Sequence, residues 1–174
     1  RFIHNNYSHV RKLFEVYDMN DIPIKNSYEN KILKLLNDKL GFYDIVLVND
    51  YGHGLMTEKI RKLIERKSKF LSLNCQINAG NEGFNLITKY NKAHNICIDL
   101  EEAKKAINMK YINIQKIPEE LFKKIQTKYL TVTLGSKGSL TATKKNKKPI
   151  LFEAFTNKIK DTMGAGDAYF AYSS

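Results

Sequence analysis

Residues 44–74 read DIVLVNDYGHGLMTEKIRKLIERKSKFLSLN, and they give the clearest indication of architecture in the chain. Two apolar runs of strand length, Asp44 to Val48 and Phe70 to Leu73, flank an amphipathic segment. Thr57 can cap that segment as a helix, because a threonine side chain accepts a hydrogen bond from a free N–H of the first turn. Nearly continuous apolar strands joined through a helix are typical of parallel strands covered by helices. The stretch therefore predicts a β-α-β unit.

The same alternation continues on both sides of this unit. Strands are expected at Asn95 to Ile98 and at Leu130 to Leu134, and Pro118 suits the first turn of a further helix. Residues 26–29, NSYE, have the spacing of a capping box and predict an earlier helix. The positions that this helix would bury are Ile32, Leu33, Leu35 and Leu36. The predicted fold class is α/β, with a mostly parallel sheet and helices on both faces.

The apolar period changes from Ser139 onward. Residues 139–143 and 150–155 are β-like runs joined by the charged segment KKNKKP, which predicts an antiparallel hairpin at or near a sheet edge. Residues 1–21 are mixed and suggest a strand or an edge segment. The chain opens on Arg1 rather than Met and stops soon after a glycine motif, where a helix ought to continue. We therefore expect residues 1–174 to form a single partial domain that is truncated at both ends.

Composition excludes several classes of protein. The 174 residues are 43% hydrophobic and 27% charged, and no apolar run approaches the roughly 18 residues that span a bilayer, so we expect a soluble protein with no membrane partner. The net charge of +11 favours phosphate binding of any kind, but the lysines are spread along helical stretches, so nucleic acid is an improbable partner. With only Cys75 and Cys97, a reducing, cytoplasmic setting is expected.

One glycine-rich run carries the chemistry. Gly164, Ala165 and Gly166 precede Asp167 and a short helical stretch. Glycines allow close approach of the backbone, and amides at a helix N-terminus can hold an anion, so the run has the features of a phosphate cradle. Asp167 at its mouth could accept the proton of a hydroxyl that attacks a phosphoryl group. Taken in isolation, the run is also compatible with a helix cap that carries an acid at the positive dipole end.

The context of this run decides between the two interpretations. Residues 161–168, DTMGAGDA, resemble the C-terminal signature Asp-Thr-x-Gly-Ala-Gly-Asp of the ribokinase-like PfkB carbohydrate kinases. The resemblance implies a ribokinase-like fold, in which the α/β domain here would be the later, ATP-binding part. It also implies that Asp167 is the catalytic base and that Gly164, Ala165 and Gly166 form the anion hole.

A second match lies upstream at the expected distance. Residues 132–138, VTLGSKG, resemble the segment that borders the nucleotide in these kinases, although alone they would be an ordinary strand leading to a glycine turn. The resemblance implies ATP as cosubstrate and assigns nucleotide contacts to four residues. These are Thr133, Gly135, Gly138 and Thr162.

A further segment resembles the branch that phosphorylates heptose 7-phosphate. Residues 49–55, NDYGHGL, are similar to its Ser-Asp-Tyr-x-Lys-Gly-Val run, which implies substrate contacts at Asp50 and Gly52. His53 replaces the usual Lys of that run, and Asp50 is equally compatible with a helix-capping acid. Residues 74–85, NCQINAGNEGFN, depart from the heptose kinases and resemble kinase modules found beside sugar nucleotidyltransferase modules.

An acidic pair opens the segment after the strand at Asn95 to Ile98. Asp99 and Glu102 stand where many relatives carry Asn-x-x-Glu, a motif that organises Mg²⁺ and phosphate through water. Carboxylate oxygens suit such a hard cation, so the resemblance implies indirect metal support here. Two acids at the start of a helix are also common capping residues, and both interpretations stay open.

Together these features predict an ATP-dependent kinase of a sugar or sugar phosphate, in surface-polysaccharide or nucleotide-sugar precursor synthesis. The partners expected are the sugar and ATP, with Mg²⁺ as cofactor, and a fused or separate nucleotidyltransferase module and a homodimer are left open. The 174-residue chain alone is expected to be inactive. The alternative is a catalytically inactive kinase-like module that binds or regulates within a larger sugar-activating protein, which the substitutions at His53, Asn74 and Asp99 would favour.

Overall fold

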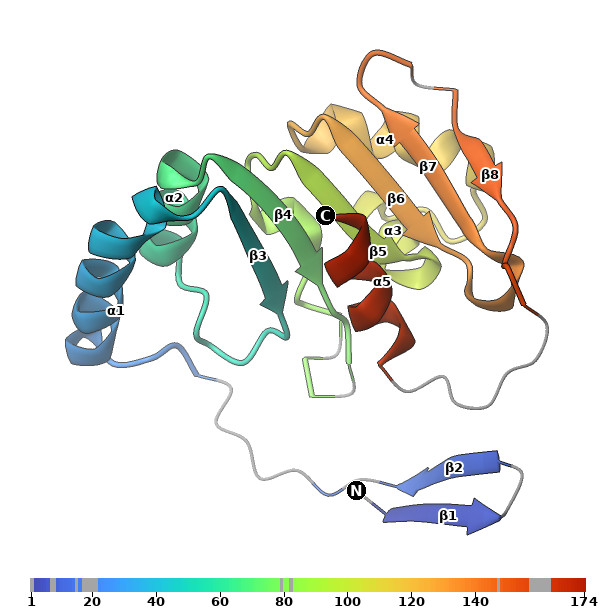
Figure 1. Cartoon of the computed structure of the whole chain (residues 1–174), viewed down its shortest axis with the longest axis horizontal. Coiled ribbons are helices and arrows are strands. Elements are labelled where there is room, and N and C mark those ends of the chain that lie inside the picture. The colour runs from blue at the N-terminus through green and yellow to red at the C-terminus, as the bar shows by residue number, and fades with distance from the viewer. Residues whose placement is uncertain are drawn as a thin grey trace.

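A six-stranded sheet forms the body of the molecule (Figure 1). The computed structural model describes residues 2–6, 9–14, 16, 22–78, 80–81, 83–146, 148–156 and 164–174. The sheet has the order β3-β4-β5-β6-β7-β8. Its strands are β3 (Ile45–Asp50), β4 (Phe70–Cys75), β5 (Asn95–Asp99), β6 (Tyr129–Thr133), β7 (Ser139–Thr143) and β8 (Ile150–Phe152). Strands β3 to β6 are parallel, whereas β7 and β8 pair antiparallel to their neighbours, so both the parallel sheet and the edge hairpin are confirmed.

Helices cover the two faces of this sheet unequally. Figure 1 shows α2, α3 and α4 behind the sheet and α5 alone in front, with α1 outside β3. The helices are α1 (Asn26–Lys39), α2 (Glu58–Lys67), α3 (Leu100–Ile107), α4 (Ile117–Lys124) and α5 (Ala165–Ser173). Short 3₁₀ turns occupy η1 (Leu40–Phe42), η2 (Ile87–Lys89), η3 (Ile114–Lys116) and η4 (Gly135–Lys137). The prediction of helices on both faces is confirmed.

The first residues form a sheet of their own. Strands β1 (Phe2–Asn6) and β2 (His9–Phe14) pair antiparallel as a hairpin, separate from the six-stranded sheet (Figure 1). The mixed pattern of residues 1–21 therefore contained two strands rather than one.

The core lies between the parallel strands and the helices behind them. Leu73, Ile96, Leu130 and Val132 have no exposed surface, and Ile60 of α2 is 1% exposed. Burying an aliphatic side chain of this size stabilises the fold by about 1.5–3 kcal/mol. These residues are the apolar positions of the predicted strands and of the helix after Thr57. Hydrophobic burial therefore explains why these segments form strands and a helix that face the core.

The helix starts were predicted with mixed success. Thr57 caps α2, since its hydroxyl accepts a hydrogen bond from Ile60 N at 3.4 Å, and Pro118 lies in the first turn of α4. The capping box at residues 26–29 is wrong, because Lys25 is the N-cap of α1 and makes no side-chain cap bond. Glu29 instead turns toward α2, where Thr57 Oγ1 donates to Glu29 Oε1 at 2.6 Å. Leu35 was wrongly placed in the core: it is 58% exposed, although α1 packs against α2.

The carboxyl ends of the parallel strands bring the sequence motifs together. Asp50, Cys75, Asp99 and Thr133 are the last residues of β3 to β6, and parallel strands end at the same edge of a sheet. The N-terminus of α5 lies at this edge as well (Figure 1). Ligands of open α/β sheets bind outside the carboxyl ends of the strands, so this edge is the place for a functional site.

Candidate active site

The N-terminus of α5 has the geometry expected of an anion cradle. Gly164 is its N-cap, with φ 73° and ψ 4°. This left-handed conformation favours glycine, because a side chain would clash with the following carbonyl. Ala165, Gly166 and Asp167 form the first turn, whose N–H groups have no acceptor within the helix. Among the described residues, none lies within 4 Å of a Cβ added at Gly164 or Gly166, so these residues leave open space beside the two backbone positions.

Asp167 is half-buried in this first turn and contacts two other segments. Gln76 Nε2 donates to Asp167 Oδ1 at 2.8 Å, and the Tyr51 hydroxyl donates to the same oxygen at 3.4 Å. Gln76 follows β4 directly, and Tyr51 follows β3. Sequence analysis assigned neither residue to the site. Their positions immediately after two parallel strands were the signal that could have found them.

A cavity of about 200 Å³ lies next to the cradle and gathers residues from several motifs. Its lining consists of Asn74, Gln76, Ile77, Cys97, Ile98, Asp99, Glu102, Thr133 and Gly166. Four of the predicted site residues, Asp99, Glu102, Thr133 and Gly166, therefore share one cavity although they lie up to 67 positions apart (166 − 99). The fold brings together the segments that the sequence motifs identified separately.

Asp99 and Glu102 form a capping box at the start of α3. Asp99 Oδ1 accepts from Glu102 N at 2.7 Å, and Glu102 Oε2 accepts from Asp99 N at 2.8 Å. The other oxygen of Glu102 accepts from Ile77 N at 3.0 Å. Burial raises the pKa of the Glu102 carboxyl to about 7, and the Asp99 carboxylate adds to this rise while the two backbone N–H bonds oppose it. The capping interpretation of this pair is therefore confirmed.

Asn74 presents an unsatisfied acceptor at the same cavity. Its Nδ2 donates to the Cys97 carbonyl at 2.7 Å, which fixes the orientation of the amide. Its Oδ1 is buried and has no hydrogen-bond partner within the part of the chain that the structure describes. A buried acceptor without a partner costs about 1–3 kcal/mol, so a water, a hydroxyl or a cation bound in the cavity would relieve this cost.

The glycine turn after β6 has one structurally required glycine and one open position. Gly138 has φ 95°, and a Cβ there would lie 1.9 Å from the Phe152 carbonyl oxygen at the end of β8. Gly135 has φ 60° and nothing within 4 Å of an added Cβ. Thr133 lines the cavity, whereas Gly135 and Gly138 form the turn that follows it. Thr162, the fourth expected nucleotide contact, lies outside the described residues.

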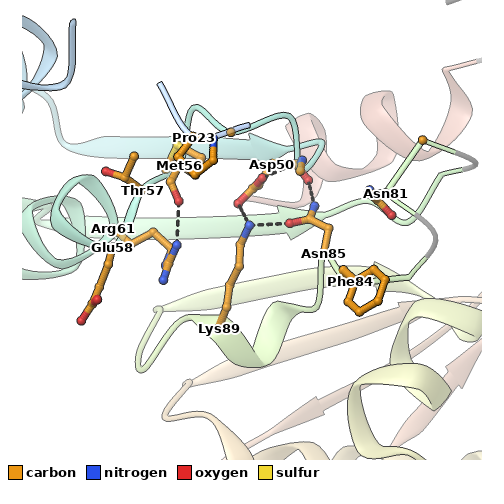
Figure 2. A pocket seen from close by; sticks show the side chains of 13 residues that line it. Pro23, Asp50, Met56, Thr57, Glu58, Arg61, Asn81, Phe84, Asn85 and Lys89 are labelled. Atoms are coloured by element: carbon orange, nitrogen blue, oxygen red, sulfur yellow. Dashed lines mark hydrogen bonds and ion pairs between the residues drawn. The ribbon is translucent and has the colours of Figure 1, made fainter. Parts of the chain in front are cut away.

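Asp50 and Gly52 line a different, larger cavity of about 480 Å³ (Figure 2). The Asp50 side chain is 3% exposed and accepts from Gly52 N at 2.9 Å and from the Tyr90 hydroxyl at 2.8 Å. Lys89 Nζ lies 2.5 Å from Asp50 Oδ2 and also donates to Asn85 Oδ1. The structure thus gives Asp50 an ion pair in place of a free carboxylate, and this pair was not predicted. Burial beside Asp50 raises the pKa of Tyr90 far above its ordinary value, so the hydroxyl remains a donor.

The asparagine-rich segment after β4 connects the two cavities. Asn81 Nδ2 donates to the Tyr51 and Gln76 carbonyls at 3.0 and 2.9 Å, and Asn85 Nδ2 donates to the Asp50 and Gln76 carbonyls at 2.6 and 3.0 Å. These bonds hold the chain after β3 against the chain after β4. The asparagine-rich segment, in which this sequence departs from the heptose kinases, therefore holds the loops of the site in place.

Two features are absent from the part of the chain that the structure describes, a metal-binding cluster and a membrane-spanning helix. The described part of the chain holds no group of three or more His, Cys, Asp or Glu side chains placed to bind a metal ion. Within the same residues, no helix combines the length and the apolar character needed to cross a membrane.

A mostly parallel α/β sheet, with an acid at a helix N-terminus beside a cavity at the carboxyl edge, is the arrangement of α/β proteins whose helix N-termini can hold an anion. The family model described as pfkB family carbohydrate kinase matches residues 30–171. The chain therefore belongs to the pfkB family of carbohydrate kinases.

Curated relatives agree with this assignment. The chain is 26% identical over 146 residues to the bifunctional protein HldE of Campylobacter jejuni subsp. doylei, which covers 82% of this chain and 30% of that protein. It is 24% identical over 174 residues to HldE of Wolinella succinogenes, which covers 98% of this chain and 35% of that protein. The chain thus spans about a third of the length of these relatives.

Solved structures share the fold. Phosphofructokinase-2 from Escherichia coli, in complex with substrates and products, superposes with a TM-score of 0.64 at 15% identity over 87% of this chain and 52% of that chain. Ribokinase from Arabidopsis thaliana, complexed with ribose and ATP, gives 0.54 at 18% identity over 82% and 44%. The fold of this chain is therefore ribokinase-like, as predicted.

Proposed function

We propose that this chain is the ATP-binding and catalytic-base part of a kinase that phosphorylates a hydroxyl of a sugar or sugar phosphate. The observation that carries the proposal is the meeting of Asp167 and Gly166 with Asp99, Glu102 and Thr133 at one edge of the sheet. These residues come from three motifs that are far apart in sequence. Membership of the pfkB family supports the general reaction, and the residue roles are our proposal.

The reaction requires two functions of the α5 N-terminus. The backbone N–H groups of Ala165, Gly166 and Asp167 hold the transferred γ-phosphoryl group, because the positive end of a helix favours negative charge. Asp167 accepts the proton of the sugar hydroxyl as that oxygen attacks phosphorus. The bond between the γ-phosphorus and the bridging oxygen then breaks, and ADP leaves with both electrons of that bond.

The nucleotide lies beside the end of β6 in this proposal. Thr133 lines the cavity next to the cradle, and Gly135 in the turn that follows leaves open space for a ligand to approach the backbone. Gly138 contributes by holding the shape of the turn, since its close approach to β8 excludes any side chain. Thr162 keeps its expected role as a further nucleotide contact.

Mg²⁺ fits the donor set of the smaller cavity through water. Both oxygens of Glu102 already accept backbone N–H bonds, which hold its side chain at the start of α3, so in this proposal Glu102 acts on the ion through water. The buried Oδ1 of Asn74 and the carboxylate of Asp99 supply the oxygen atoms that hydrated Mg²⁺ prefers. When bound, the ion would neutralise charge on the phosphates, and the role of these residues is to orient its water shell.

The acceptor lies in the larger cavity in this proposal. Asp50 and Gly52 line it, and the intervening Tyr51 reaches Asp167, which connects the cavity to the base. The similarity of residues 49–55 to the heptose 7-phosphate kinases supports a phosphorylated sugar of that class in nucleotide-sugar or surface-polysaccharide synthesis. The bifunctional relatives support a fused or separate nucleotidyltransferase partner. The proposed location is the cytoplasm, and whether the kinase forms a homodimer is left open.

The test is Asp167→Asn in the full-length kinase. The substitution keeps the shape of the cradle and removes the base, so we expect kcat to fall about 10²–10⁴-fold with little change in ATP affinity. Steady-state phosphorylation of heptose 7-phosphate and related sugars measures kcat, and calorimetry measures the affinity for ATP. Near-parental turnover by this variant would refute the role of Asp167 as the base. Absence of sugar phosphorylation by the parental full-length protein would instead favour the second candidate, an inactive kinase-like binding module.

The 174-residue chain alone is expected to show little or no kinase activity. It aligns with 44–52% of the solved kinases named above, so much of the enclosure that excludes water during transfer belongs to other segments. A coupled ADP-release assay on this chain and on the full-length kinase checks the expectation, and robust turnover by the chain alone would contradict it.

A further inference from the structure

We propose that Gln76 is a positioning residue for the catalytic base, an inference that rests on the role proposed for Asp167. Gln76 Nε2 donates to Asp167 Oδ1 at 2.8 Å, across 91 positions of sequence. The Tyr51 hydroxyl donates to the same oxygen at 3.4 Å. Both donors engage one carboxylate oxygen, and within the described residues Oδ2 is left to receive the proton of the substrate hydroxyl.

The backbone of Gln76 is held firmly enough to aim its side chain. Its N–H donates to the Asp50 carbonyl at 2.9 Å, and its carbonyl accepts from Asn81 and Asn85 at 2.9 and 3.0 Å. Both asparagines are buried, and Figure 2 shows Asn85 next to Asp50 and Lys89. The asparagine-rich segment thus fixes the point from which the Gln76 amide reaches the base.

The chemistry of an amide suits this position. The N–H of glutamine stabilises an ionised carboxylate by hydrogen bonding, yet it carries no charge that would hold the carboxylate in an ion pair. A base fixed in orientation transfers a proton efficiently, and a misplacement of about 1 Å can cost about 10²-fold in rate. Gln76 therefore acts on the reaction through Asp167 and does not itself take part in proton transfer.

The experiment compares Gln76→Leu and Gln76→Glu with the matched control Gln115→Leu in the full-length kinase. Gln115 is a glutamine in the turn η3, in a different part of the fold. We expect Gln76→Leu to lower kcat about 10- to 100-fold while the KM for ATP changes less than about 2-fold. Gln115→Leu should leave both parameters unchanged.

The pH profile separates a positioning role from a purely structural one. Gln76→Glu places a second carboxylate beside Asp167, and two carboxylates that share a site cannot both ionise readily. The acid limb of kcat/KM should move to higher pH in Gln76→Glu, and to a smaller extent in Gln76→Leu. Among the residues that the structure describes, the other titratable groups at this site are Tyr51 and, in the neighbouring cavity, Cys97, Asp99 and Glu102, and none of them is altered by these variants.

The outcomes distinguish this inference from the proposed function. Parental kcat and an unchanged pH profile in both Gln76 variants, alongside a large loss in Asp167→Asn, would overturn the positioning role alone. Parental kcat in Asp167→Asn would overturn both. If thermal unfolding shows that Gln76→Leu does not fold, Gln76→Glu, which keeps the size and polarity of the side chain, decides the question through its pH profile.

Discussion

The ion pair between Asp50 and Lys89 offers a direct test of the structure through stability. Asp50 is 3% exposed, whereas the Lys89 side chain is 24% exposed, so the two charges differ in their access to water. Lys89→Met removes the cation and leaves a buried carboxylate with two neutral donors, Gly52 N and the Tyr90 hydroxyl. Breaking a buried ion pair in this way lowers the free energy of unfolding by about 3–5 kcal/mol.

Asp50→Asn should be less destabilising than Lys89→Met. The ammonium left behind can extend its tip toward water. The amide oxygen at position 50 can still accept from one of the two donors, which bind different oxygens of the carboxylate. We expect Asp50→Asn to lower the free energy of unfolding by about 1–3 kcal/mol. The double variant should cost clearly less than the sum of the single variants, because it leaves neither charge unpaired.

Urea denaturation of the chain at pH 7 measures these differences, with the m value as a check that the unfolding reaction is the same. Lys69→Met is the matched control, because Lys69 pairs with Asp44 at 3.0 Å while both side chains are more than half exposed. An exposed pair contributes almost nothing measurable. The reasoning from burial would be refuted if Lys89→Met lowered the free energy of unfolding no more than Lys69→Met does, or less than Asp50→Asn does.

Two further predictions concern stability. Burial raises the pKa of Glu102 to about 7, against an ordinary value of 4.5. Between pH 4.5 and 7 the folded state therefore holds a proton that the unfolded state has released. The free energy of unfolding should fall by about 3 kcal/mol as the pH rises through this range. Glu102→Gln should flatten that dependence in urea titrations from pH 4 to 8, and an equal slope in both proteins would contradict it. Gly138→Ala should lower the free energy of unfolding by at least about 2 kcal/mol, because the added Cβ would meet the Phe152 carbonyl. Gly135→Ala should lower it by only about 1 kcal/mol, because its Cβ meets no described residue and only the left-handed backbone is unfavourable. Thermal melts of the two glycine variants measure the difference, and equal melting temperatures would argue against the close contact.

Local signals were sufficient for most of the elements. The apolar runs at residues 44–48 and 70–73 predicted strands, and Thr57 and Pro118 marked helix starts correctly, because caps and propensities act over a few neighbouring residues. The capping box at residues 26–29 failed for a non-local reason. Glu29 has a better partner in Thr57, 28 positions away, than in the N-terminus of its own helix.

The candidate site was predicted in part. The motif around Asp167 and the pair Asp99 and Glu102 could be recognised because each lies within a short segment. The contact of Gln76 with Asp167 and the pairing of Asp50 with Lys89 could not, because each joins segments that only the folded chain brings together. Asp50 shows the consequence, since nothing in its sequence context predicted the buried ion pair that it forms with Lys89.

The sequence by itself determined the α/β class, the order of the parallel strands and the helices between them, and the family, since hydrophobic periodicity and short motifs are local properties of the chain. Only the tertiary structure decided which motifs share a cavity, which asparagines join the ends of β3 and β4, and which donors hold Asp167. Those contacts depend on the parallel register that places Asp50 beside Cys75 and Asp99 beside Thr133. Register follows from packing the whole sheet against its helices, and no single segment encodes it.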